Sequence, residues 1–112
     1  MKIKQETFYK TPKWKSLRES ILMRDKYMCQ YCKRYGKHVQ ADHVHHILPR
    51  EFFPQYSYTP WNLISLCNKC HEAMHYRKDK TLTAEGKELV SIMARKYFLD
   101  LDKIIGGGVK EN

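Results

Sequence analysis

Two C-x-x-C pairs constrain the fold of this chain more than any other feature of its sequence. Cys29 and Cys32 form the first pair, Cys67 and Cys70 form the second, and 34 residues lie between the pairs. Four thiolates suit a tetrahedral Zn²⁺, and an ion with all four positions filled has a structural role. Four buried free cysteines are the alternative. The spacing therefore predicts one structural Zn²⁺ that joins two distant knuckles.

The size of the chain favours such a metal site. At 112 residues, with 29% charged residues and a mean hydropathy of −0.70, the chain suits one small domain with a modest core. No apolar run approaches the roughly 20 residues that span a bilayer, and the N-terminus lacks the apolar core of a secretory signal. We expect a soluble, cytoplasmic protein, in a compartment that keeps thiols free for metal binding.

The positive charge is concentrated at one end of the sequence. Residues 1–37 carry 11 Lys and Arg against three Asp and Glu, whereas the remaining residues carry ten against nine. Such a bias attracts polyanions, and nucleic acid is the usual partner of a small basic domain. A hydrated surface with no partner is the alternative.

The N-terminal third is predicted to be helical. Residues 1–10 form an arm that carries Phe8 and Tyr9 as docking aromatics, and fraying is its alternative. Thr11 followed by proline predicts the start of a helix that runs to about Asp25. Its exposed cations face either phosphates or solvent; they are Lys13, Lys15, Arg18 and Arg24. The knuckle that follows ends at Gly36, which is free to take a positive φ.

The middle of the chain is predicted to hold two strands and the last third two helices. Residues 39–47 and 61–66 are the strands, joined by an irregular loop rich in proline and aromatic residues. Asn68 caps a short helix to about Arg77, and Thr83 caps a longer helix to Ile105. We expect a single domain over residues 11–105 and a disordered tail over residues 106–112, without a domain boundary between the knuckles.

Two histidines follow the second cysteine pair at helical spacing. On a helix, His71 and His75 project from one face, so both rings can share a metal ion, or both can be ordinary surface histidines. The segment also spells the H-E-x-x-H signature of zinc proteases, in which Glu72 would activate water. No further ligand motif follows, and Glu72 is interpreted as a solvated helix residue.

The sequence resembles the HNH endonucleases at three places. His45-His46-Ile-Leu-Pro49 matches the histidine dyad of the family's first strand, Asn62 matches its asparagine, and His71 matches the histidine of its helix. The cysteine pairs resemble those of the zinc-stabilised branch, and the segment from Phe8 resembles small phage-encoded members. The resemblance covers roughly residues 8–77. It implies an α+β fold, with a ββα-metal (His-Me finger) motif, a four-cysteine structural zinc site and flanking helices.

The resemblance also implies a function and a role for each matched residue. His46 would be the general base, Asn62 would orient it, and His45, His71 and His75 would hold one catalytic divalent ion. The implied activity is metal-dependent DNA hydrolysis, by nicking or by double-strand cleavage, in phage DNA packaging or processing in the host cytoplasm. A terminase or another packaging protein is the implied partner. The alternative function is a non-catalytic, zinc-containing module that binds nucleic acid.

One departure from the family leaves a choice of register. Most members carry Asp-His rather than His-His, and Asp42-His43 stands three residues earlier. Only His45-His46 places a proline three residues after the base, which favours that register. Asp42 and His43 then become neighbours of the site or ordinary strand residues. A histidine in place of the usual aspartate favours Mn²⁺, Ni²⁺, Co²⁺ or Zn²⁺ over Mg²⁺ as the catalytic ion.

Overall fold

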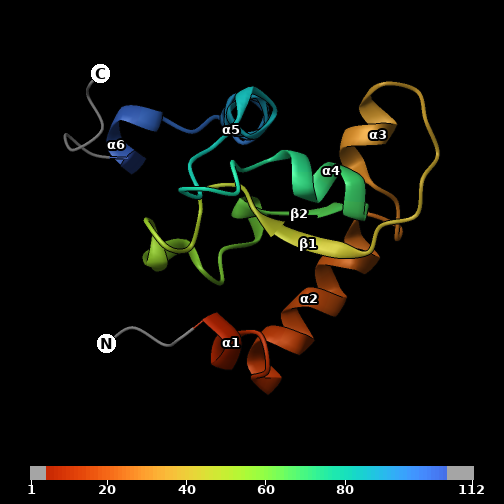
Figure 1. Cartoon of the computed structure of the whole chain (residues 1–112), viewed down its shortest axis with the longest axis horizontal. Helices are drawn as coiled ribbons and strands as arrows, with labels where there is room; N and C mark the ends of the chain where they lie inside the picture. Colours follow the sequence, from red (N-terminus) through yellow and green to blue (C-terminus); the bar gives the residue numbers. More distant parts are fainter. Residues whose placement is uncertain (1–4, 106–112) are drawn as a thin grey trace.

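The structure is a computed structural model and describes residues 5–105. A two-stranded antiparallel sheet lies at the centre of the fold (Figure 1). Strand β1 (His43–His46) pairs with β2 (Leu63–Leu66), and His45 lies opposite Ile64. Helix α4 (Asn68–Ala73) follows β2 directly. These three elements form the predicted ββα unit within an α+β fold, so the predicted fold class is confirmed.

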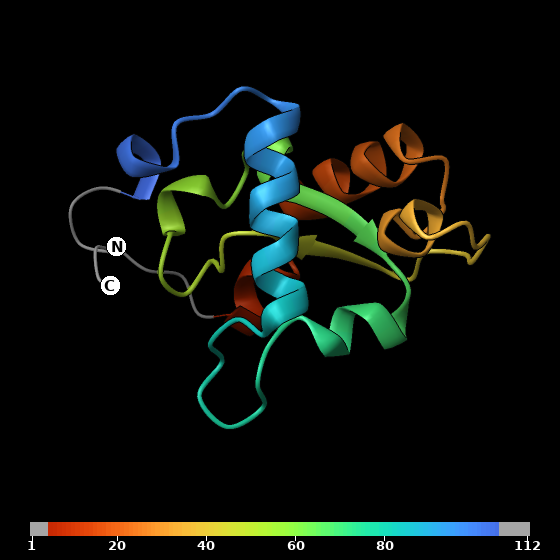
Figure 2. The same ribbon diagram turned by 90° about the horizontal axis from the view of Figure 1, so that it is seen from above.

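Helices cover both faces of the sheet. Helix α2 (Pro12–Arg24) lies on one side of the strands, and α5 (Ala84–Lys96) crosses them on the other (Figures 1 and 2). Two separate hydrophobic clusters fill the two interfaces. The α2 cluster contains Phe8, Trp14, Ile21, Leu22, Ala41, Val44 and Leu63. The α5 cluster contains Cys29, Ile47, Leu48, Leu66, Cys67, Met74, Leu89 and Met93.

The N-terminal helix begins as the sequence predicts. The hydroxyl of Thr11 accepts a hydrogen bond from the backbone N–H of Trp14 at 3.2 Å, and Pro12 is the first helical residue. Before it, the short helix α1 (Gln5–Phe8) inserts Phe8 into the α2 cluster, where its side chain is only 1% exposed. The predicted docking of Phe8 is therefore confirmed.

The first knuckle is a compact turn between α2 and β1. Helix α3 (Gln30–Arg34) starts directly after Cys29, and Gly36 adopts a φ of 82° that an L side chain rarely tolerates. The strand predicted for residues 39–47 is shorter in the structure. Only residues opposite β2 are paired in the sheet, and Gln40 instead forms an isolated bridge with Met28.

The predicted helix from Asn68 to Arg77 is wrong in its extent and in its cap. Cys67 occupies the N-cap position, and α4 ends at Ala73. His75 lies beyond the helix and forms an isolated β-bridge with Leu82. This pairing joins residues seven positions apart and turns the chain out of the helical path, and the spacing of His71 and His75 gives no sign of it.

The C-terminal helix begins where predicted but ends early. Thr83 accepts a hydrogen bond from the N–H of Gly86 at 3.1 Å, which confirms it as the cap of α5. The helix stops at Lys96 because Phe98 adopts a φ of 55°, and a separate helix α6 (Leu101–Ile105) follows. The tail predicted for residues 106–112 lies outside the described residues.

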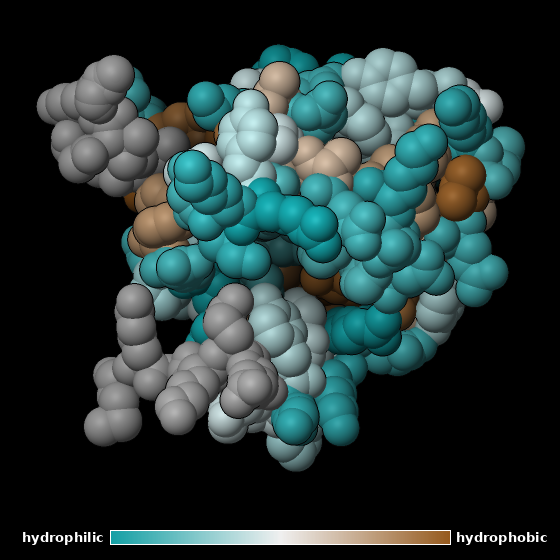
Figure 3. All heavy atoms as spheres, in the orientation of Figure 1, coloured by the Kyte–Doolittle hydropathy of each residue, from teal (hydrophilic) through white to brown (hydrophobic). Residues whose placement is uncertain are grey.

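The loop between the strands contains two short 3-10 helices, η1 (Pro54–Tyr56) and η2 (Pro60–Asn62), consistent with its predicted irregular character. Across residues 5–105, no helix combines the length and apolar character that crossing a bilayer requires. The space-filling view shows a largely hydrophilic face, with a few hydrophobic atoms visible in a central hollow (Figure 3).

The buried position of Phe8 gives a direct test of this packing. We predict that Phe8→Ala lowers the free energy of unfolding by about 3–5 kcal/mol, because it leaves a cavity against α2. Phe98→Ala is the matched control: its side chain is 95% exposed, so its effect should stay within about 0.5 kcal/mol. Urea denaturation measures both variants, and equal stabilities would contradict the docking of α1.

Candidate active site and metal centre

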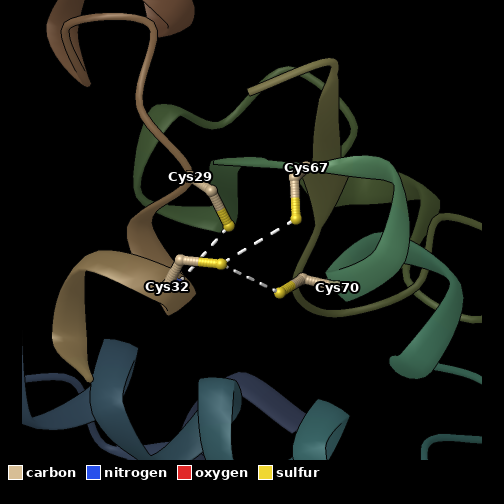
Figure 4. A group of neighbouring side chains, drawn as sticks. All are labelled: Cys29, Cys32, Cys67 and Cys70. Atoms are coloured by element: carbon tan, nitrogen blue, oxygen red, sulfur yellow. Dashed lines mark hydrogen bonds between the residues drawn. The ribbon is translucent and has the colours of Figure 1, made fainter. Parts of the chain in front are cut away.

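The four cysteines converge at the junction of α3, β2 and α4 (Figure 4). Their sulfur atoms all lie within 4.8 Å of one another. The Sγ atom of Cys32 is 3.9 Å from that of Cys67 and 3.6 Å from that of Cys70. A tetrahedral ion with Zn–S bonds of about 2.3 Å separates its sulfurs by about 3.8 Å. The cluster therefore fits a tetrahedral thiolate site.

Burial and crowding set the protonation of these thiols. Burial raises the pKa of Cys32, and burial together with hydrogen bonds that its thiol donates to the other cysteines raises the pKa of Cys70. Burial acts to raise the pKa of Cys67 as well, but hydrogen bonds from the other cysteines outweigh it, so the pKa of Cys67 is lowered. Four crowded thiolates repel one another unless a divalent ion compensates their charge, and metal binding then displaces the protons. Among the described residues, this is the one group of three or more potential ligands whose donor atoms converge so closely.

Three histidines meet on the α4 side of β1. The ring centroid of His45 lies 5.6 Å from that of His71 and 5.2 Å from that of His75. His45 is 2% exposed, and its buried Nε2 atom has no hydrogen-bond partner. The ligand atoms of these histidines do not converge as closely as the four sulfurs do, but a buried imidazole nitrogen without a partner beside two further imidazoles is a candidate metal ligand. The structure thus brings near one another the three residues predicted to hold the catalytic ion.

These histidines are held neutral at physiological pH. Burial lowers the pKa of His45 well below its ordinary value, and the neighbouring His71 and His75 add to the effect. Burial and the nearby His43 and His75 lower the pKa of His71 to about 4. Burial also lowers the pKa of His75, with a contribution from Lys80. A neutral imidazole is the form that binds metal, so the cluster is prepared for an ion.

His46 points to the opposite face of β1, as alternate residues of a strand do. Its Nε2 atom lies 2.9 Å from the carbonyl oxygen of Ser57. Because a carbonyl only accepts, Nε2 carries the proton, and the lone pair is on Nδ1. The hydroxyl of Tyr9 lies 3.4 Å from Nδ1, and the indole of Trp14 stacks on the ring at 5.1 Å. Burial lowers the pKa of His46, which favours the neutral ring.

Asn62 fixes the loop that leaves β1. Its side chain is fully buried, accepts a hydrogen bond from the N–H of Leu48 at 2.7 Å and donates to the carbonyl of Leu48 at 3.1 Å. It also donates to the carbonyl of Tyr56 at 3.2 Å. The amide therefore holds the backbone of Leu48, two residues after His46. The sequence predicted that Asn62 would bind backbone near His46.

A cleft of about 910 Å³ runs past all of these histidines, and no cysteine lines it. It follows β1, which has no second strand partner among residues 5–105. The residues that line it are Tyr9, Trp14, Lys15, Arg18, His43, Val44, His45, His46, Pro49, Arg50, Glu51, His71, His75 and Lys80. Four cations against one carboxylate give the cleft a positive lining that suits phosphate groups.

Three of the four basic residues of α2 divide into two groups, and the fourth, Lys13, lies over the ring of Tyr58. Lys15 and Arg18 line the cleft, and Arg18 also donates to the carbonyl of Asp42 at 2.9 Å. Arg24 instead pairs with Asp25 at 2.8 Å and donates to backbone carbonyls of the strand region. Arg24 therefore ties α2 to the sheet. The sequence predicted that Arg24 faces phosphate or solvent, whereas its guanidinium binds acceptors within the protein.

The ββα unit with a histidine dyad, an asparagine and a helix histidine defines the class of HNH nucleases, and two comparisons agree. The HNH endonuclease family profile matches residues 29–77. The crystal structure of an HNH endonuclease from the deep-sea thermophilic bacteriophage GVE2, with manganese ion, is 34% identical, with a TM-score of 0.58. The alignment covers 60% of this chain and 73% of that one. This chain belongs to the HNH endonuclease family and is a nuclease. A search of curated proteins gave no match.

The protease interpretation of H-E-x-x-H lacks its structural basis. That signature needs both histidines on one continuous helix, whereas α4 ends at Ala73, before His75. Glu72 is exposed, and its carboxylate accepts a hydrogen bond from Asn68 at 3.4 Å. Glu72 is therefore a surface residue of α4.

Sequence patterns alone did not identify every residue around His46. The contact between His46 and Ser57 uses a backbone carbonyl, which leaves no side-chain signature in the sequence. Tyr9 was predicted as a docking aromatic, but its hydroxyl also approaches His46. Neither contact could be found without the fold that brings α1 and the loop to β1.

Substitutions can separate the four-cysteine cluster from the histidine cluster. We predict that purified protein holds about one tightly bound Zn²⁺ and that Cys32→Ser lowers this content towards zero. Loss of the bound ion removes its contribution to the free energy of folding. A loss of only about 2 kcal/mol would lower the thermal unfolding midpoint by ~10 °C, since 1 kcal/mol corresponds to roughly 4–8 °C in a domain of this size, so we expect a shift of at least that size.

His71→Ala is the control for that experiment. It should keep the zinc content and the unfolding midpoint, because His71 contributes no sulfur ligand to the cluster. Elemental analysis and differential scanning calorimetry measure both quantities. A Cys32→Ser protein with unchanged zinc and unchanged melting would rule out the four-cysteine site.

Proposed function

We propose that this nuclease is a metal-dependent DNA endonuclease in which His46 is the general base. The observation that carries the proposal is the arrangement along β1. The lone pair of His46 faces Tyr9 at the cleft, while His45, His71 and His75 gather beside the same strand. A proton acceptor and a metal-ligand cluster thus border one positively lined cleft.

In the proposed reaction, His46 accepts the proton of a water molecule at Nδ1 as that water attacks phosphorus. The P–O bond to the 3′ oxygen breaks, and the 3′ oxygen takes a proton from solvent water, which leaves a 5′-phosphate and a free 3′-hydroxyl. The hydrogen bond from Nε2 to Ser57 holds the ring and stabilises the imidazolium that forms. A positioned base of this kind contributes about 10²- to 10⁴-fold in rate.

His45, His71 and His75 would hold one divalent ion. Such an ion supplies charge stabilisation at the phosphate and at the leaving oxygen. The manganese in the similar phage endonuclease supports Mn²⁺ as a competent ion, beside Mg²⁺, Ni²⁺, Co²⁺ or Zn²⁺. The four-cysteine cluster would hold a separate structural Zn²⁺.

Asn62 acts on the base through the backbone in this proposal. Its amide holds both the N–H and the carbonyl of Leu48, so the chain after His46 has one path into the loop. The same amide grips Tyr56, which adjoins the Ser57 carbonyl that anchors His46. Asn62 is therefore proposed as an orienting residue and not as a reactant.

Residues 11–105 are proposed as the nuclease domain, with α1 packed on it. A role in phage DNA packaging, with a terminase partner, stays a prediction from the family resemblance. The alternative of a non-catalytic module that binds nucleic acid keeps the positive cleft and gives His46 a packing role alone, against Trp14 and the carbonyl of Ser57. Cleavage assays separate these two functions directly.

The first prediction from this proposal concerns the base. Supercoiled plasmid incubated with protein and Mn²⁺ should be nicked, and EDTA should stop the reaction. His46→Ala should lower the rate by about 10²-fold or more, the contribution expected of a general base. His38→Ala is the matched control, because His38 is exposed and lies outside the cleft. If both variants cleave at the wild-type rate, the assignment of the base is wrong.

The second prediction concerns the cations of α2. Replacing Lys15 and Arg18 together by alanine should weaken DNA binding and reduce the slope of log K against log salt by about 2, since each phosphate contact contributes about 0.9. The control removes two exposed charges outside the cleft, Lys33 and Lys37. Fluorescence anisotropy over a salt series, on zinc-loaded protein without added Mn²⁺ or Mg²⁺, measures both. Equal slopes would move the DNA to another surface.

A further inference from the structure

We propose that His43 is a positioning residue for the metal ligand His71, and that Asn68 sets the orientation of His43. The inference rests on the proposed function, in which His71 holds the catalytic ion. His43 lies two residues before His45, so both side chains face α4 from the same side of β1. The rings of His43 and His71 are stacked, with centroids 4.4 Å apart and planes 18° from parallel.

His71 needs such support from outside its own helix. Helix α4 has only six residues, and a helix of this length is not stable by itself. Metal-binding histidines usually donate their second ring N–H to a protein acceptor, which fixes the ring. Within residues 5–105, the ring of His71 has no such hydrogen bond, and its contacts are the rings of His43 and His45. The stack on His43 is therefore what holds its plane.

His43 is itself anchored to the start of α4. Its Nε2 atom lies 2.8 Å from the side-chain oxygen of Asn68, an acceptor that places the ring proton on Nε2. The backbone N–H of Asn68 donates to the carboxylate of Asp42 at 3.2 Å. Asp42 and His43, adjacent at the start of β1, thus both form hydrogen bonds with Asn68 in the first turn of α4. This double contact sets where the helix, and with it His71, stands against the strand.

The geometry favours positioning over direct ligation by His43. The lone pair of an imidazole nitrogen lies in the plane of its ring. Two nearly parallel rings stacked 4.4 Å apart direct their lone pairs side by side and not towards a common point. The tilted pair of His45 and His71, with planes 74° apart, has no such restriction. His43 therefore supports the ion site through its face and leaves coordination to the other histidines.

The test measures Mn²⁺ affinity by isothermal titration calorimetry on zinc-loaded protein, without DNA. His43→Ala should weaken Mn²⁺ binding about 10- to 100-fold, the usual effect of losing a group that orients a metal ligand. Asn68→Ala should weaken binding in the same direction, and the double variant should be no weaker than His43→Ala alone. Lys69→Ala is the control on the same helix, because Lys69 is exposed and should leave the affinity unchanged.

Two further variants distinguish the possible failures. His71→Ala should abolish Mn²⁺ binding; if it does not, the proposed histidine site is wrong, and this inference falls with it. If His71→Ala abolishes binding but His43→Ala keeps the wild-type affinity, the positioning role alone is overturned. His43→Phe keeps a stacking ring and should recover most of the loss, with about one zinc per chain. A Phe variant as weak as the Ala variant would contradict the stacking role.

Discussion

The convergence of four sulfur atoms is the contact on which the rest of the structure depends. Both strands lie between Cys32 and Cys67, so an ion at the cluster closes a loop that contains the whole β1–β2 pair. Closing that loop removes conformational freedom that two four-residue strands cannot offset by their own pairing. Cys70 is covalently adjacent to His71, so the structural cluster also fixes the start of the helix that carries a proposed catalytic ligand.

Strand β1 places the proposed base and the proposed metal ligand on opposite sides. Consecutive residues of a strand face opposite sides, so His45 meets His71 and His75, while His46 meets Tyr9 and Trp14. A proposed base and a proposed metal ligand are thus neighbours in sequence but sit in different surroundings. The base side is aromatic and anchored to a backbone carbonyl, and the ligand side is a group of imidazoles. Both sides open on the same cleft.

Local chemistry explains why parts of this structure could be predicted from sequence. Thr11 before a proline and Thr83 before α5 are caps that act within one turn, and both are confirmed. The four-cysteine cluster and the histidine cluster could be predicted for a similar reason, because the residues of each motif lie close together in the sequence. The shortened α4 was missed because His75 also has helical spacing from His71, and its bridge to Leu82 leaves no motif in the sequence. The anchor of His46 on Ser57 was missed because any residue type supplies a carbonyl.

The glycine at position 86 connects α5 to the site in a way that reaches beyond packing. A Cβ atom there would clash with the carbonyl oxygen of Met74, so the helix backbone packs directly on the residue before His75. A larger residue at position 86 would therefore have to displace the segment that leads into His75. Helix α5 lies outside the matched family region, and its backbone packs directly against the end of that region. The position of His75 thus depends on the absence of a side chain in a helix that the family match does not include.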